Sequence, residues 1–174
     1  MLRAEYTEKL SITRNLAAAL KDEKRKDAVS SGHTFYRDGR EVAHIYNFMS
    51  GPSRIEIGND VFSFDRRNRV VLFTQYYTLI HGGQTEATAK ESIMFFASKS
   101  RISYAADSHH DLILKAASWN SNGRKFRVTE GAEEVGVIEH DSEFGADIDL
   151  LPQIPLAVQI FIYQVSFRMW QRGR

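Results

Sequence analysis

Apolar and polar residues alternate in short runs through the middle of the chain, between His33 and His140. A period of two is expected for β-strands with one buried face. Turn-forming residues separate the runs at intervals of about 8 to 12 residues, which is typical of an all-β barrel or sandwich. The predicted strands lie in HTFYRDGREVAHIY, IEIGNDVFSF, VVLFTQYYTLI, ESIMFFA, RISYA, DLILKAASW, RKFRVTE and EEVGVIEH.

Turn chemistry supports this assignment. Asp38-Gly39 supplies the positive φ that a two-residue hairpin turn needs, so Phe35 is expected to face Val42 across the hairpin. An Asn-Gly pair at 122–123 is a second strong hairpin signal. Before the strands, the run LAAALKDEKRK at 16–26 predicts a helix with a solvated, charged face.

The last segment, LPQIPLAVQIFIYQVSFRMWQRGR, is apolar over most of its length. Pro155 fits the first helical position, and the helix is expected to continue to about Gln171. On a helical wheel, Gln164 and Arg168 share one narrow stripe with Gln171, while most of the remaining circumference is apolar. Such a helix is either the centre of a core or a membrane span.

Two features favour a buried helix over a membrane span. Gln159 and Gln164 lie within the apolar run, and the run is short for a bilayer crossing. We therefore predict a central helix with Phe161 as an anchor of the core. A small barrel filled by its own side chains has no room for a helix, so the strands must form a wider barrel around it.

Length, charge and cysteine content limit the number of domains, the kind of partner and the compartment. The 174 residues suffice for one domain, here 1–174, with a single core. The 23 Lys and Arg nearly balance the 22 Asp and Glu, a formal net charge of +1, which excludes a global attraction to nucleic acid. The chain has no cysteine, and its start lacks a secretory signal, so we expect a cytoplasmic protein.

The order of these elements resembles a known family. A strand, an Asp-Gly turn and a strand are followed by RKFRVTEGAEEVGVIEH, the acidic loop DSEFGADIDLLP and an apolar helix ending in MWQRGR. This pattern is similar to the tubby C-terminal-like superfamily, which includes tubby proteins, phospholipid scramblases and LURP-one-related proteins. The resemblance covers the chain from Ser31 onward and is strongest after Asn120. It implies a closed antiparallel β-barrel of about a dozen strands around a buried C-terminal helix.

The resemblance also indicates a class of ligand, because tubby domains bind phosphoinositide headgroups and scramblase-like members are associated with membranes and calcium. In scramblases the acidic segment before the helix is the one associated with calcium. Four carboxylates here, on Asp141, Glu143, Asp147 and Asp149, can offer oxygen ligands to a weakly held Ca²⁺. The spacing departs from an EF-hand, and the same acids can simply keep a strand edge soluble. No other cofactor is expected.

Basic residues form two clusters that can hold a phosphorylated headgroup by convergent donors. These clusters are Lys99 with Arg101, and Arg124, Lys125 and Arg127. In a strand, Lys125 and Arg127 share one face and Arg124 points to the other. The alternative is that these residues only make the barrel exterior soluble.

Other polar groups carry weaker signals. His109 and His110, between Asp107 and Asp111, invite a metal interpretation, but no ligand spacing supports it, and an exposed polar turn explains them equally. Trp170, followed by Arg172 and Arg174, fits either a membrane-contacting tail or a barrel rim.

These observations lead to a function without an enzyme active site, because no nucleophile motif or acid-base constellation is present. We predict a module that associates with anionic phospholipid at a membrane surface, without a transmembrane span. The alternative is a structural or protein-interaction domain, with an unknown partner and no lipid binding.

Overall fold

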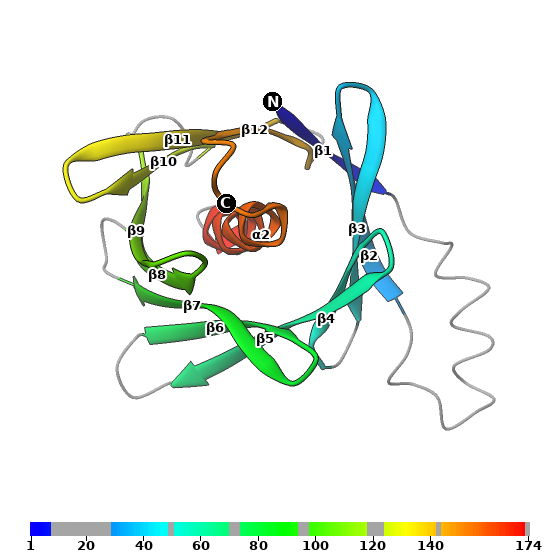
Figure 1. The fold of residues 1–174 in the computed structure, drawn as a ribbon, viewed down its shortest axis with the longest axis horizontal. Helices are drawn as coiled ribbons and strands as arrows, with labels where there is room; N and C mark the ends of the chain where they lie inside the picture. Colours follow the sequence, from blue (N-terminus) through cyan, green and yellow to red (C-terminus); the bar gives the residue numbers. More distant parts are fainter. Residues whose placement is uncertain are drawn as a thin grey trace.

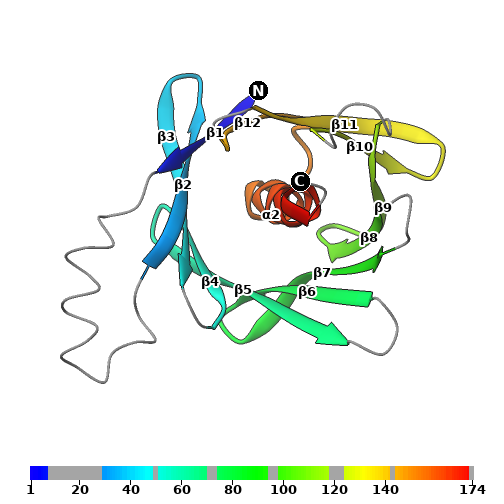
Figure 2. The ribbon, with the colours of Figure 1, turned by 180° about the vertical axis from the view of Figure 1, so that it is seen from behind.

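A computed structural model describes residues 1–7, 29–48, 51–69, 74–93, 98–117, 124–141 and 144–172. Within these residues, twelve antiparallel strands form a closed barrel and a helix, α2, lies inside it (Figure 1 and Figure 2). The predicted fold class is therefore confirmed. The helix predicted at 16–26 and the Asn-Gly turn at 122–123 lie outside the described residues.

The strands follow one another around the barrel in chain order, and β1 closes it by pairing with both β12 and β2. Their bounds are β1 (Leu2–Thr7), β2 (Val29–Arg37), β3 (Arg40–Phe48), β4 (Ser53–Ile57), β5 (Asp60–Arg69), β6 (Thr74–His81), β7 (Gln84–Ile93), β8 (Ser98–Ala105), β9 (His109–Ala116), β10 (Lys125–Glu130), β11 (Glu133–His140) and β12 (Ala146–Leu150). Helix α2 spans Leu156–Arg172.

The sequence pattern did not predict the two strands that close the barrel, β1 and β12, or the first part of β7. Leu2 of β1 pairs with Ile148 of β12 on one side and with Arg37 of β2 on the other. The segment around Ile148 is thus a strand, and its description as part of an acidic loop was wrong. Leu2 and Ala4 are buried while Arg3 is only partly so, which is the alternation of a barrel strand.

The first hairpin differs from the prediction by one residue. Asp38 and Gly39 form the turn with φ of 53° and 75°, as expected. Phe35, however, pairs with Ala43 instead of Val42, because the register shifts after Phe35. This bulge moves Ala43 to the interior face, where the small side chain faces the buried Phe35 ring.

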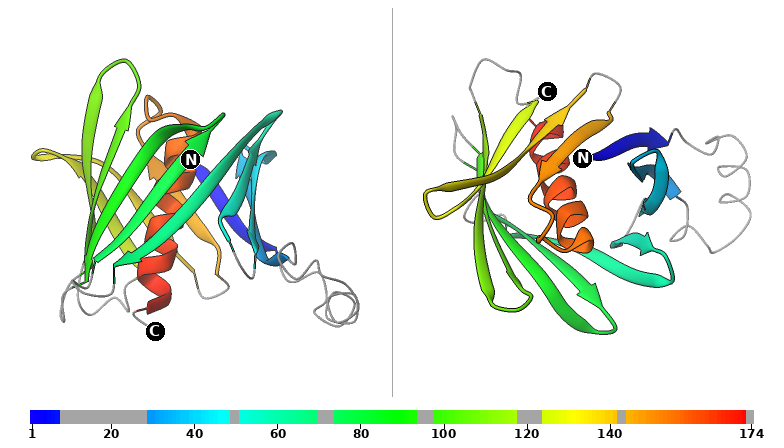
Figure 3. Two further views of the ribbon diagram at one scale, coloured as in Figure 1. Left: turned by 90° about the horizontal axis from the view of Figure 1, so that it is seen from below. Right: turned by 45° about the horizontal axis from the view of Figure 1, so that its top comes forward.

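Helix α2 runs along the barrel interior and supplies much of its core (Figure 3). It begins directly after Pro155, and twelve of its residues are buried, on all sides of the helix. Phe161 is fully buried and packs 5.7 Å, centroid to centroid, from Phe64 of β5. The predicted central helix is confirmed, because the inward side chains of the surrounding strands remove its whole apolar circumference from water.

Candidate functional site

The outer face of β7 to β10 collects positive charge. Lys99 on β8 pairs directly with Lys115 on β9, and Lys115 pairs with Arg127 on β10. In the neighbouring row, Lys90 on β7 pairs with Arg101 on β8. All five residues are exposed, and together they form what we call the basic band.

The basic band is poorly compensated by acids. Arg127 Nε lies 3.6 Å from a Glu134 carboxylate oxygen. Among the described residues, Lys99, Arg101 and Lys115 have no acidic group within ion-pairing distance. Like charges directly opposite each other on neighbouring strands are destabilising. The arrangement therefore lowers stability unless an anion lies against it.

The structure brings together only some of the predicted basic residues. Lys125 is in an ion pair with Glu139, 3.3 Å from Nζ to Oε2. Arg124 is partly buried, and its carbonyl accepts a hydrogen bond from the His140 amide. The sequence search missed Lys90 and Lys115, because each is an isolated cation in its own segment. Only the strand register places them beside the predicted ones.

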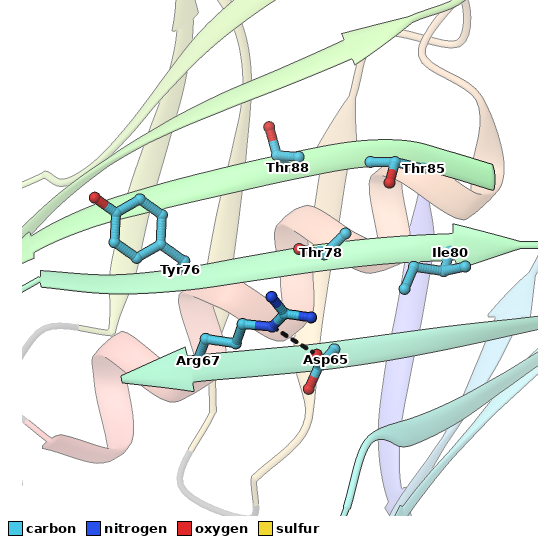
Figure 4. Close-up of a pocket in the computed structure, with 7 residues that line it drawn as sticks. All are labelled: Asp65, Arg67, Tyr76, Thr78, Ile80, Thr85 and Thr88. Atoms are coloured by element: carbon cyan, nitrogen blue, oxygen red, sulfur yellow. Dashed lines mark hydrogen bonds and ion pairs between the residues drawn. The ribbon is translucent and has the colours of Figure 1, made fainter. Parts of the chain in front are cut away.

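A shallow hollow lies beside the basic band on the outside of β5 to β7 (Figure 4). In strand register, Arg67 pairs with Tyr76, and Tyr76 pairs with Lys90 of the band. The Lys90 ammonium lies 5.9 Å from the centroid of the Tyr76 ring. The remaining wall consists of Asp65, Thr78, Ile80, Thr85 and Thr88. Threonine hydroxyls line this open surface, and its Arg67 is partly neutralised by Asp65, 3.4 Å from Nε to Oδ2.

The basic band lies nearer to one end of the barrel. This is the end where α2 terminates. Lys99 pairs with Ser92, and the neighbouring residue of β7, Glu91, bonds Arg172 at the end of the helix. Hairpins at the opposite end carry charges of both signs, namely the exposed Asp38, Asp60, Asp107 and Glu133 and the exposed Arg40.

In the predicted calcium loop, two of the carboxylates are engaged by an arginine side chain. Arg3 bonds two of its carboxylates, at 2.7 Å to Asp141 and 3.0 Å to Asp147. Asp149 is exposed on β12, and Glu143 lies outside the described residues. Within the described part of the chain, no group of three metal-ligating side chains occurs. Calcium binding at this segment stays a prediction of the resemblance.

The remaining predicted polar features have local partners. His110 lies 2.8 Å from Glu130 and stacks on Tyr104, while His109 is 3.5 Å from Asp111. Trp170 is only 1% exposed and stacks on His140, so its ring is a core group and cannot contact a membrane. Arg174 lies outside the described residues.

Two histidines are enclosed in the barrel. His33 Nε2 lies 3.2 Å from the Phe144 carbonyl, and burial lowers the pKa of His33 to about 4. His140 Nε2 lies 2.9 Å from Ser166 Oγ, and burial, followed by the charge of His33, lowers the pKa of His140 to about 3. Because the Ser166 hydroxyl donates to the Tyr163 carbonyl, His140 is the donor to Ser166. This serine and histidine are inaccessible core groups.

Comparisons with protein-family models, curated proteins and solved structures find no match for this chain. The tubby-like assignment accordingly stays a prediction based on the sequence pattern. None of the helices in the described residues has the length and apolar character needed to cross a membrane.

Proposed function

We propose that this protein is a non-enzymatic module that docks on anionic phospholipid through the basic band. The observation that carries the proposal is the row formed by Lys99, Lys115 and Arg127, which lie directly opposite one another on three adjacent strands. Two of these cations have no acidic partner among the described residues. An anionic surface would relieve the repulsion that the row creates.

The expected strength follows from the number of cations. Each Lys or Arg near an anionic membrane surface contributes about 1 kcal/mol, so the row contributes about 3 kcal/mol, or a factor of about 100 in affinity. Exposed charges are screened over about 8 Å at physiological ionic strength, so binding should weaken as salt is added.

Two further observations support a lipid headgroup as the ligand. The hollow beside Lys90 offers threonine hydroxyls next to the basic band, while its Arg67 is held in an ion pair with Asp65. The sequence resembles a superfamily in which tubby domains bind phosphoinositides.

Flotation with vesicles tests the proposal. Wild type should float with phosphatidylcholine vesicles that contain phosphatidylserine and stay at the bottom with phosphatidylcholine alone. Lys99→Glu plus Lys115→Glu should abolish flotation. The matched control is Arg40→Glu plus Arg54→Glu, an equal change of charge at two exposed residues on β3 and β4, across the barrel. If wild type does not float with anionic vesicles at low salt, the protein-interaction alternative is preferred. If the two double variants lose flotation equally, the basic band is not the lipid-binding surface.

A further inference from the structure

A second group of cations lies on the inner side of the barrel, at the end where α2 terminates. Arg168 and Arg172 are one turn apart on α2. Arg66 of β5 pairs with Tyr77, whose buried ring points into the barrel, so Arg66 lies on the inward face of its strand. Three guanidinium groups therefore gather at this mouth of the barrel.

Arg172 is neutralised by a buried acid. It forms an ion pair with Glu91, whose side chain is completely buried on β7. The Tyr77 hydroxyl lies 2.8 Å from the other oxygen of Glu91, and Arg172 also donates to Gln75 at 2.6 Å. This acid is thus fully engaged with Arg172 and Tyr77.

Arg168 has no such compensation. Within the described part of the chain, its one hydrogen bond runs from Nη2 to Asn47 Oδ1 at 3.1 Å. That oxygen also accepts from Ser53 at 2.7 Å and from Gln164 at 2.9 Å. The Arg168 Nε atom is buried without a hydrogen-bond partner, while the side chain as a whole stays partly exposed. Among the described residues, no carboxylate lies within ion-pairing distance of Arg168 or Arg66.

The electrostatic consequence is an unfavourable site that an anion would correct. Burial lowers the pKa of Arg168, and the positive charges of Arg66 and Arg172 lower it further. Arginine stays charged in proteins, so the charge cannot be removed by deprotonation. Planar guanidinium groups bind phosphate oxygens by paired N–H···O hydrogen bonds.

We propose that Arg66 and Arg168 bind a phosphate monoester group at the mouth of the barrel. Phosphate fits the site better than a carboxylate, because its additional oxygens can accept from two guanidinium groups at once. The group can belong to a soluble organic phosphate or to a phosphorylated lipid headgroup. The site is separate from the basic band, and the proposal does not depend on docking through that band.

Thermal unfolding with inorganic phosphate tests the site directly. At ten times its dissociation constant, phosphate should raise Tm by about 3 to 6 °C relative to chloride of equal ionic strength. Arg168→Gln and Arg66→Gln should each abolish the rise, and Arg40→Gln, at an exposed position on β3, should retain it. If Arg168→Gln does not fold, the exposed Arg66 decides the test alone.

Vesicles distinguish the two sources of phosphate. Vesicles with phosphatidylinositol 4-phosphate are compared with phosphatidylserine vesicles of equal surface charge. If the phosphate belongs to a lipid headgroup, more protein should float with the phosphoinositide vesicles than with the phosphatidylserine vesicles, and Arg66→Gln should remove this difference. If the phosphate belongs to a soluble compound, inorganic phosphate should raise Tm and the two kinds of vesicle should float the protein equally. Failure of the basic band would remove flotation with phosphatidylserine and leave the rise in Tm intact. The site is refuted if phosphate raises Tm no more than chloride does and Arg66→Gln changes neither Tm nor flotation. It is also refuted if phosphate still raises Tm in both Arg66→Gln and Arg168→Gln.

Discussion

Acid should destabilise this protein through the two enclosed histidines, His33 and His140. Their pKa values in the folded state, about 4 and about 3, lie below the value of about 6.5 expected for an unfolded chain. Between these limits the unfolded state binds more protons, so stability falls as pH falls. The stability gained by burying the two imidazoles in their neutral form is complete above about pH 6.5. It is lost progressively toward pH 4 for His33 and toward pH 3 for His140.

The magnitude follows from the width of this window. One pH unit corresponds to about 1.36 kcal/mol for each group, so lowering the pH from 6.5 to 5.0 costs about 2 kcal/mol per histidine. The pair therefore loses about 4 kcal/mol, a large part of the 5 to 15 kcal/mol that is typical of a folded domain. At pH 5.0 both folded-state values still lie below the solvent pH, so both histidines contribute to the slope.

Urea unfolding at pH 7.0 and pH 5.0 measures this loss. Wild type should lose about 4 kcal/mol more between the two pH values than His33→Gln plus His140→Gln, in which the titrating groups are absent. His109→Gln, at an exposed site on β9, should behave like wild type. Equal pH dependence in wild type and the double variant would show that the histidines are hydrated or already charged, and would refute the reasoning.

Three further predictions concern the core. Phe161→Ala should cost about 3 to 5 kcal/mol in urea unfolding, because it removes a fully buried ring; a loss below about 1 kcal/mol would contradict the packing. In hydrogen exchange, amides from 156 to 167 should open only near the global free energy, and fast exchange there would contradict the central position of α2. Glu91→Gln should cost about 3 kcal/mol, since it leaves Arg172 unpaired, whereas Glu91→Met plus Arg172→Met should cost less. Equal losses in these two variants would mean that the ion pair is not the cause.

The group of arginines at the mouth of the barrel and the basic band were not predictable from sequence in their observed form. Lys99 and Lys115 are sixteen residues apart along the chain and become direct neighbours only through the pairing of β8 with β9. Arg66 and Arg168 belong to a strand and to the helix, and which face of β5 carries Arg66 follows from its pairing with Tyr77. A search for adjacent cations therefore found parts of the band and not the mouth.

The same distinction explains which strands the pattern revealed. Large inward residues alternating with polar ones are visible locally, as in β9, where Leu112 and Leu114 are buried. The first part of β7 was missed because its inward residues are Ala87 and Ala89, small side chains that give little hydrophobic alternation.

The sequence by itself determined the local elements: strand periodicity, the Asp38-Gly39 turn, and a C-terminal helix apolar on nearly every side. Each depends on side chains and backbone preferences within a few residues. The tertiary structure decided the closure of β1 on β12, the bulge after Phe35 and the two groupings of positive charge. These depend on strand register, in which a shift of one residue moves a side chain to the opposite face, and such pairing joins residues far apart along the chain.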